Sequence, residues 1–191
     1  MNIDKRLNLV VPIERDDGTN LYIHSTPISY EVFEKYFLVI SKTFAGIYSE
    51  GLNVLAGPKI AAIMLKRIAQ ELGLWDGEEG VGSGLMSEIR RLSNVLCLTD
   101  GKWQPLPLET ALNRGLIGED DFRVAEGAIV FFICISAMHN RSLVESTLNG
   151  MCDLWGLQTT SLNCSEYGNL LPTLTETDNS GEKVTLSAIP S

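Results

Sequence analysis

The glycine-rich run from Gly80 to Gly84 has residue types that could bind a phosphate group. Closely spaced glycines let backbone amides surround a phosphate, and a lysine just after the last glycine supplies the countercharge. No lysine follows Gly84 at that spacing, and no clear strand precedes Gly80. We therefore interpret the run as a flexible connector before a helix.

The histidines, cysteines and carboxylates do not form a catalytic or metal-binding pattern. His24 and His139 lie far apart, His139 has no nearby nucleophile, and the four cysteines contain no C-x-x-C pair. Cys134 and Cys152 fall in apolar helical patterns, where free cysteine packs as a small hydrophobe. The acidic clusters fall at turns, loops or helix starts. We expect no catalytic residue, no metal site, no cofactor and no enzymatic activity.

The charge balance argues against two classes of partner. The 191 residues include 24 acidic and 15 basic side chains, for a net charge of −9. This charge repels nucleic-acid phosphates and anionic lipid head groups. The longest apolar run, from Gly127 to Met138, is shorter than the ~20 residues that span a bilayer, and the first residues lack the features of a secretory signal. We expect neither nucleic acid nor membrane to be a partner, and we expect the protein to lie in a reducing cytoplasm.

The first 28 residues predict a β-hairpin. Apolar side chains alternate in two short runs on either side of Asp17-Gly18, a turn signal, and Pro27 follows the second run. An isolated hairpin is marginal in water, so this one must pack on helices or pair with another chain. Its exposed edge is a candidate contact between copies of the protein.

Helical spacing dominates the next 130 or so residues. Ser29 is a predicted N-cap, Pro58 is expected in the first turn of the second helix, and a long apolar helix after Glu119 is expected at the centre of a bundle. The first helix is expected to face the core with Val32, Phe33, Tyr36, Phe37, Ile40, Phe44 and Ile47. The third helix is expected to carry Leu85, Ile89, Leu92 and Leu96.

The predicted fold class is mainly α, a helical bundle of about six helices with an N-terminal β-hairpin and a disordered C-terminal arm. We expect the hairpin at residues 1–28 to pack on a helical domain at 29–156, followed by a flexible arm at 157–191. The arm is rich in Ser, Thr, Asn and Gly and has no sustained apolar period. It therefore lacks the apolar surface that would offset its ordering entropy.

Sparse apolar side chains in this polar arm are the predicted partner contacts, because such segments often fold on binding. The tryptophan that precedes the arm could either close the edge of the core or anchor a partner. An arm without a function remains the alternative. The candidate partner-binding residues are Trp155, Leu157, Leu162, Tyr167, Leu170 and Leu171.

The acidic helical body and the pattern W-x-x-x-T-T-S-L-N-x-x-E-Y, from Trp155 to Tyr167, resemble the tail assembly chaperones of siphophages. The resemblance is strongest from the apolar helix around residues 128–132 through the arm. It implies a protein that coats the tape measure protein and holds tail tube subunits until tube polymerisation displaces it. It also implies a longer form made by ribosomal frameshifting near the 3′ end.

The sequence therefore predicts a non-enzymatic phage tail assembly chaperone in the host cell cytoplasm, absent from the mature virion. Its body would form oligomers and contact the tape measure protein, and its arm would contact the tail tube protein. The alternative is a structural virion protein, such as a connector or tail-completion subunit, held in a permanent ring. A small enzyme or immune-evasion factor would need a cleft that unites His139 with cysteines and carboxylates.

Overall fold

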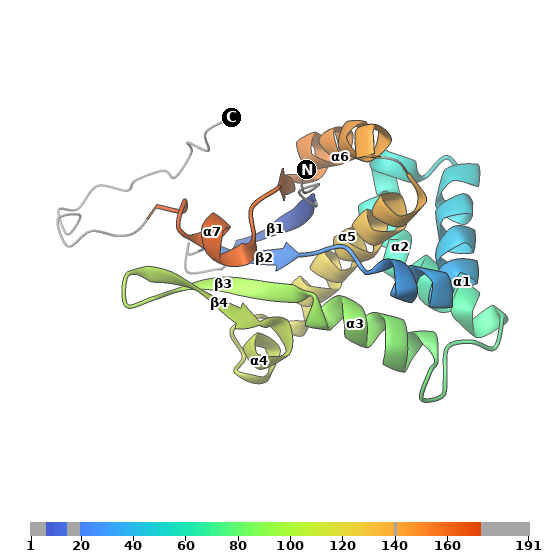
Figure 1. The fold of residues 1–191 in the computed structure, drawn as a ribbon, viewed down its shortest axis with the longest axis horizontal. Coiled ribbons are helices and arrows are strands. Elements are labelled where there is room, and N and C mark those ends of the chain that lie inside the picture. Colours follow the sequence, from blue (N-terminus) through green and yellow to red (C-terminus); the bar gives the residue numbers. More distant parts are fainter. Residues whose placement is uncertain (1–6, 15–19, 140, 173–191) are drawn as a thin grey trace.

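Five antiparallel strands form one sheet in the computed structural model, which describes residues 7–14, 20–139 and 141–172 (Figure 1). The strand order is β4-β3-β2-β1-β5. The prediction of a mainly α bundle is wrong, because the protein has an α+β fold in which three of the five strands lie outside the predicted hairpin. The strands are β1 (Asn8–Glu14), β2 (Asn20–Ser25), β3 (Ser93–Thr99), β4 (Lys102–Pro107) and β5 (Gln158–Thr160).

The predicted hairpin and most of the predicted helices are present. Ser29 caps the first helix by accepting a hydrogen bond from the Val32 amide, as expected, whereas Pro58 lies inside the second helix and not in its first turn. The helices are α1 (Tyr30–Ser49), α2 (Asn53–Glu71), the π-helix η1 (Val81–Leu85), α3 (Met86–Arg91), α4 (Leu108–Asn113), α5 (Glu119–Met138), α6 (Arg141–Trp155) and α7 (Cys164–Gly168).

The predicted third helix is in part a strand. Helix α3 ends at Arg91, and β3 begins at Ser93, whose hydroxyl donates to the Ile89 carbonyl at 2.9 Å. Val95 and Leu96 are both fully buried, because both sides of the sheet are covered at this point. Adjacent buried residues hide the alternation that marks a strand with one face in water.

The predicted disordered arm is wrong for residues 157–172, which we call the strap. Strand β5 pairs antiparallel with β1, with Thr160 opposite Asn8. Helix α7 follows, and its first turn is closed by a capping box between Asn163 and Glu166. The remainder of the predicted arm, 173–191, lies outside the described residues, as does the predicted turn around 15–19.

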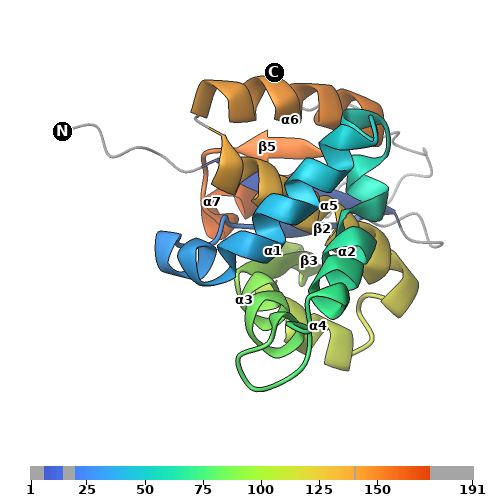
Figure 2. The same cartoon turned by 90° about the vertical axis from the view of Figure 1, so that its right-hand side faces the viewer.

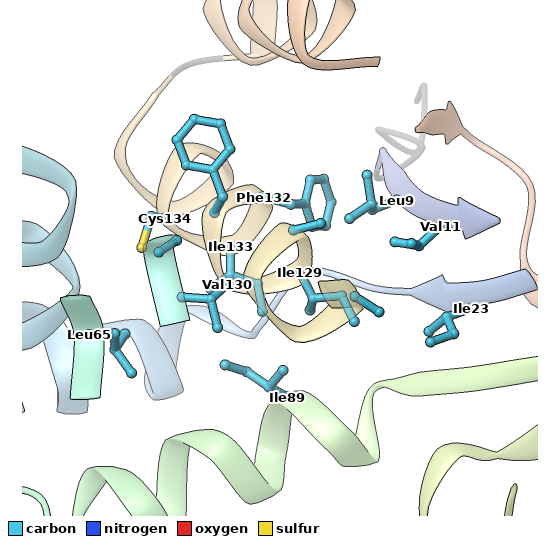
Figure 3. Close-up of a cluster of buried hydrophobic side chains, with 14 of the residues drawn as sticks. Leu9, Val11, Ile23, Leu65, Ile89, Ile129, Val130, Phe132, Ile133 and Cys134 are labelled. Atoms are coloured by element: carbon cyan, nitrogen blue, oxygen red, sulfur yellow. The ribbon is translucent and has the colours of Figure 1, made fainter. Parts of the chain in front are cut away.

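Helix α5 is the buried central element, as predicted, and it lies between α2 and the sheet (Figures 1 and 2). Glycines allow α2 and α5 to approach closely, since a Cβ on Gly127 would overlap the Pro58 carbonyl and one on Gly57 would overlap the Phe131 ring. Ile129 and Phe132 of α5 face the apolar side chains of β1 and β2 (Figure 3). Among the described residues, no helix is long and apolar enough to cross a bilayer.

Candidate functional site

The outer face of the sheet, opposite α5, carries two buried polar side chains that hold the strap. Asn8 Nδ2 donates to the Leu162 carbonyl at 2.9 Å, and His24 Nε2 reaches the same oxygen at 3.0 Å. Among the described residues, neither Asn8 Oδ1 nor His24 Nδ1 has a hydrogen-bond partner. Burial lowers the pKa of His24 more than hydrogen bonding raises it. The neutral imidazole therefore donates from Nε2.

Aromatic rings surround this polar centre. The Tyr22 ring lies 5.4 Å from that of Trp103 and 6.2 Å from that of Tyr167, all centroid to centroid. The Tyr167 hydroxyl donates to Gln158, and the indole of Trp103 donates to the Pro172 carbonyl at 3.0 Å. Burial raises the pKa of Tyr167 to about 12. The strap is thus fixed from its first strand to its last described residue.

The structure places the six predicted partner contacts in different environments. Trp155 is half-buried against the core, and Leu157 is 8% exposed. Leu162, Tyr167 and Leu171 are half-buried. Leu170 alone among the six projects into solvent, at 71% exposed. The outer face of the sheet brings Leu162 and Tyr167 together, whereas Trp155 lies at the end of α6.

In the described residues, His139 does not share a cleft with the cysteines and carboxylates that the enzyme alternative requires. The His139 ring packs on the Phe44 ring at 5.0 Å between centroids. Cys134 is fully buried, and this burial raises the pKa of its thiol to about 12, which disfavours the reactive thiolate. In the described part of the chain, no three His, Cys, Asp or Glu side chains are grouped so that they could hold a metal ion.

The glycine run is packed and does not form a flexible connector. It becomes the π-helix η1, and a Cβ on Gly80 would overlap the backbone of Trp75 and Asp76. A Cβ on Gly84 would overlap the Tyr36 hydroxyl. These glycines therefore allow the segment at 73–85 to fold against α1 and onto itself.

A polar pocket of about 300 Å³ lies on one side of this segment, between α2, α3, α4 and α5. Arg90 is placed over the Phe122 ring at 5.0 Å and pairs with Glu126 at 3.6 Å. Burial raises the pKa of Glu126, although Arg90 opposes this shift. Lys66 lies over the Trp75 ring at 5.3 Å. Because the cations already have intramolecular partners and no nucleophile is activated, the pocket has the character of a structural ion-pair site.

A second hollow, of about 480 Å³, lies on the other side of the segment, against α1. Its lining includes Tyr36 and Val39 of α1 and the charged side chains Lys35, Asp76 and Glu79. Leu38 and Leu74, which are 48% and 41% exposed, add apolar surface to it. This is an open groove of mixed polar and apolar character, across which Lys35 pairs with Glu79 at 3.4 Å.

An aromatic stripe runs along another side of α1 and consists of Tyr30, Phe33, Phe37, Phe44 and Tyr48. In the second half of the stripe, the Phe44 and Tyr48 rings lie 4.4 Å apart and are packed by His139. In the first half, Tyr30 is 71% exposed and Phe37 is 50% exposed. Figure 2 shows the end of α1 beneath α6 and its first turns lying away from α6. The first half of the stripe is the largest exposed aromatic surface of α1.

The expectation that Phe37 faces the core is wrong, and the helical period explains why. At 100° per residue, the seven residues expected in the core spread over an arc of about 140°, and Phe37 lies at one edge of it. Tyr30 lies just beyond the same edge and was not among the predicted contacts. A tyrosine and a phenylalanine seven residues apart were the available signal for a surface stripe.

Comparisons with protein-family models, curated proteins and solved structures give no match to this chain. The site must therefore be interpreted from its own geometry. The exposed half of the aromatic stripe is the group of exposed apolar side chains from which we argue a function, because its rings contact one another.

Proposed function

We propose that this protein is a non-enzymatic tail assembly chaperone of a bacteriophage, which binds the tape measure protein and the tail tube protein in the host cell cytoplasm. The observation that carries the proposal is the exposed half of the aromatic stripe on α1, with Tyr30 and Phe37 in solvent. Exposed apolar surface on an acidic protein is typical of a site that holds another protein. Helices with one apolar face are suited to such a surface.

The assignment to phage tails is supported by the resemblance of residues 155–167 to tail assembly chaperones. In this proposal the body holds the tape measure protein through α1, and the strap contacts the tube subunit. Leu170, the exposed apolar residue of the strap, is the first contact that a tube subunit would meet. Leu162 and Tyr167 would join that contact only after the strap has left the sheet.

The test is to co-express the tagged full chain with the genes that neighbour its own, and to identify the co-purifying proteins by mass spectrometry. We expect a long helical tape measure protein and a tube subunit. Phe37→Ser should reduce recovery of the tape measure protein, because it removes a ring from the stripe. Ile63→Ser, at a position 67% exposed on α2, is the matched control and should leave recovery unchanged.

Purified virions separate the chaperone from the structural alternative. A chaperone is expected to be absent from finished particles, whereas a connector or tail-completion subunit would be found there in fixed stoichiometry. Stoichiometric presence in virions, or co-purification with neither tail protein, would refute the chaperone assignment.

A further inference from the structure

We infer that the exposed half of the aromatic stripe binds a basic amphipathic α-helix, with lysine or arginine side chains flanking its apolar face. The inference rests on the proposed function, because it assigns a partner chemistry to the same surface. Three features carry it: the arrangement of the exposed rings, the way in which the chain covers the other half of the stripe, and the charges beside the rings.

The exposed rings form a continuous surface along two turns of α1. Tyr30 and Phe33 lie 6.3 Å apart at an interplanar angle of 55°, and Phe33 and Phe37 lie 5.6 Å apart at 90°. The tilted contact of the first pair and the edge-to-face contact of the second hold the rings in place. A partner therefore meets a preformed surface, which reduces the entropy lost on binding.

The covered half of the stripe shows what kind of element fits on α1. There Phe44 and Tyr48 are packed edge-on by His139, at interplanar angles of 85°. Thr147 of α6 also hydrogen-bonds the Tyr48 side chain. The chain thus covers these rings with helical segments, the end of α5 and the middle of α6. A helix supplied by another protein would cover Tyr30, Phe33 and Phe37 in the same manner.

The charges beside the exposed rings select a basic partner. Glu34 is exposed on α1 within four residues of Tyr30 and Phe37, and the whole chain carries a net charge of −9. The protein already places cations over aromatic rings, with Lys35 over Tyr36 at 5.5 Å. Lysine or arginine on a partner could pair with Glu34 and lie over the rings. A second copy of this chain would instead bring two negatively charged molecules together.

The test uses two fluorescein-labelled model helices of ~18 residues that share one leucine face, flanked by lysine in one peptide and by glutamate in the other. Fluorescence anisotropy with the full chain gives both affinities. We expect the lysine peptide to bind roughly tenfold more tightly at low salt, since several surface pairs of about 0.2–1 kcal/mol each act together. Added salt should reduce this preference.

Substitutions in the full chain test whether the lysine peptide binds at the exposed half of the aromatic stripe. Phe37→Ser should weaken binding of the lysine peptide severalfold, and Glu34→Lys should reduce the preference for it. Ile63→Ser, the control on α2, should change neither affinity, and circular dichroism would verify that all variants are folded. Equal affinity for both peptides, binding of neither, or an equal effect of Ile63→Ser would overturn the inference. So would a concentration-dependent dimer that Phe37→Ser abolishes, because a second copy would then be the occupant.

Failure of this inference can be distinguished from failure of the proposed function. If tail proteins co-purify but the charge of the model helix has no effect, the chaperone assignment stands and the partner chemistry is wrong. If the lysine peptide binds as expected but no tail protein co-purifies, the surface is assigned correctly and the function in tail assembly is wrong.

Discussion

The two faces of the sheet are covered by different kinds of contact. Helix α5 packs on the inner face through apolar side chains, including the fully buried Ile129 and Phe132. The strap covers the outer face with a three-residue strand, a five-residue helix and hydrogen bonds to Asn8, His24 and Trp103. We therefore expect the inner face to determine global stability and the outer cover to open locally.

The largest effect that tests this comparison is expected inside α5. Phe132→Ala removes a fully buried ring and leaves a cavity, so the free energy of unfolding should fall by about 3–5 kcal/mol in urea titrations. Val124→Ala is the control on the same helix, because Val124 is 71% exposed, and its effect should stay within about 0.5 kcal/mol. A loss below about 1 kcal/mol for Phe132→Ala would show that the inner face is not the main source of stability.

A smaller and local effect is expected on the outer face. Trp103→Phe keeps an aromatic ring beside Tyr22 but removes the hydrogen bond to the Pro172 carbonyl, which contributes about 0.5–1.5 kcal/mol. We expect faster amide hydrogen exchange in residues 164–171 and unchanged exchange in α5. Equal acceleration in both regions would show that the strap and the core open together.

The smallest effect is expected from a change in pH, which should weaken the cover of the outer face and leave the inner face unchanged. Burial lowers the pKa of His24 below its ordinary value of 6.5, so the folded protein favours the neutral imidazole. The stabilisation is complete above pH 6.5 and is lost as the pH falls from 6.5 towards the lowered pKa. The protection factors of the strap amides, which correct the exchange rates for the slower intrinsic exchange at lower pH, should therefore decrease on acidification. His24→Gln should remove this pH dependence, and its persistence in that variant would exclude His24 as the cause.

The sequence predicted those strands, caps and helices whose residue pattern lies entirely within one short stretch of the chain. The first hairpin, the Ser29 cap and the central helix α5 are examples. The β3–β4 hairpin carried a readable signal as well, because Asp100-Gly101 forms its two-residue turn with positive φ at both positions. This signal was overlooked because Leu92 and Leu96 continued a helical spacing across the boundary between helix and strand.

The strap could not be predicted from local patterns. Its anchors join residues that are far apart in the sequence, such as Asn8 with Leu162, which are separated by 154 positions. A polar segment of this composition has no period of its own, and it is ordered by side chains of β1, β2 and β4. The exposed half of the aromatic stripe left one local signal, the seven-residue spacing of Tyr30 and Phe37. Which rings stay exposed depends on the distant His139, which packs on Phe44 and Tyr48.

The position of β5 beside β1 has a consequence during synthesis of the chain. The first strand keeps an open edge until its partner around Thr160 has left the ribosome, about 150 residues later. At translation rates of about 5–20 residues per second, this delay lasts roughly 8–30 s. Throughout that time the nascent protein displays an unpaired, apolar strand edge, a form prone to association with other chains. Completion of the sheet is therefore a late event, and slow translation would prolong the most aggregation-prone stage of this protein.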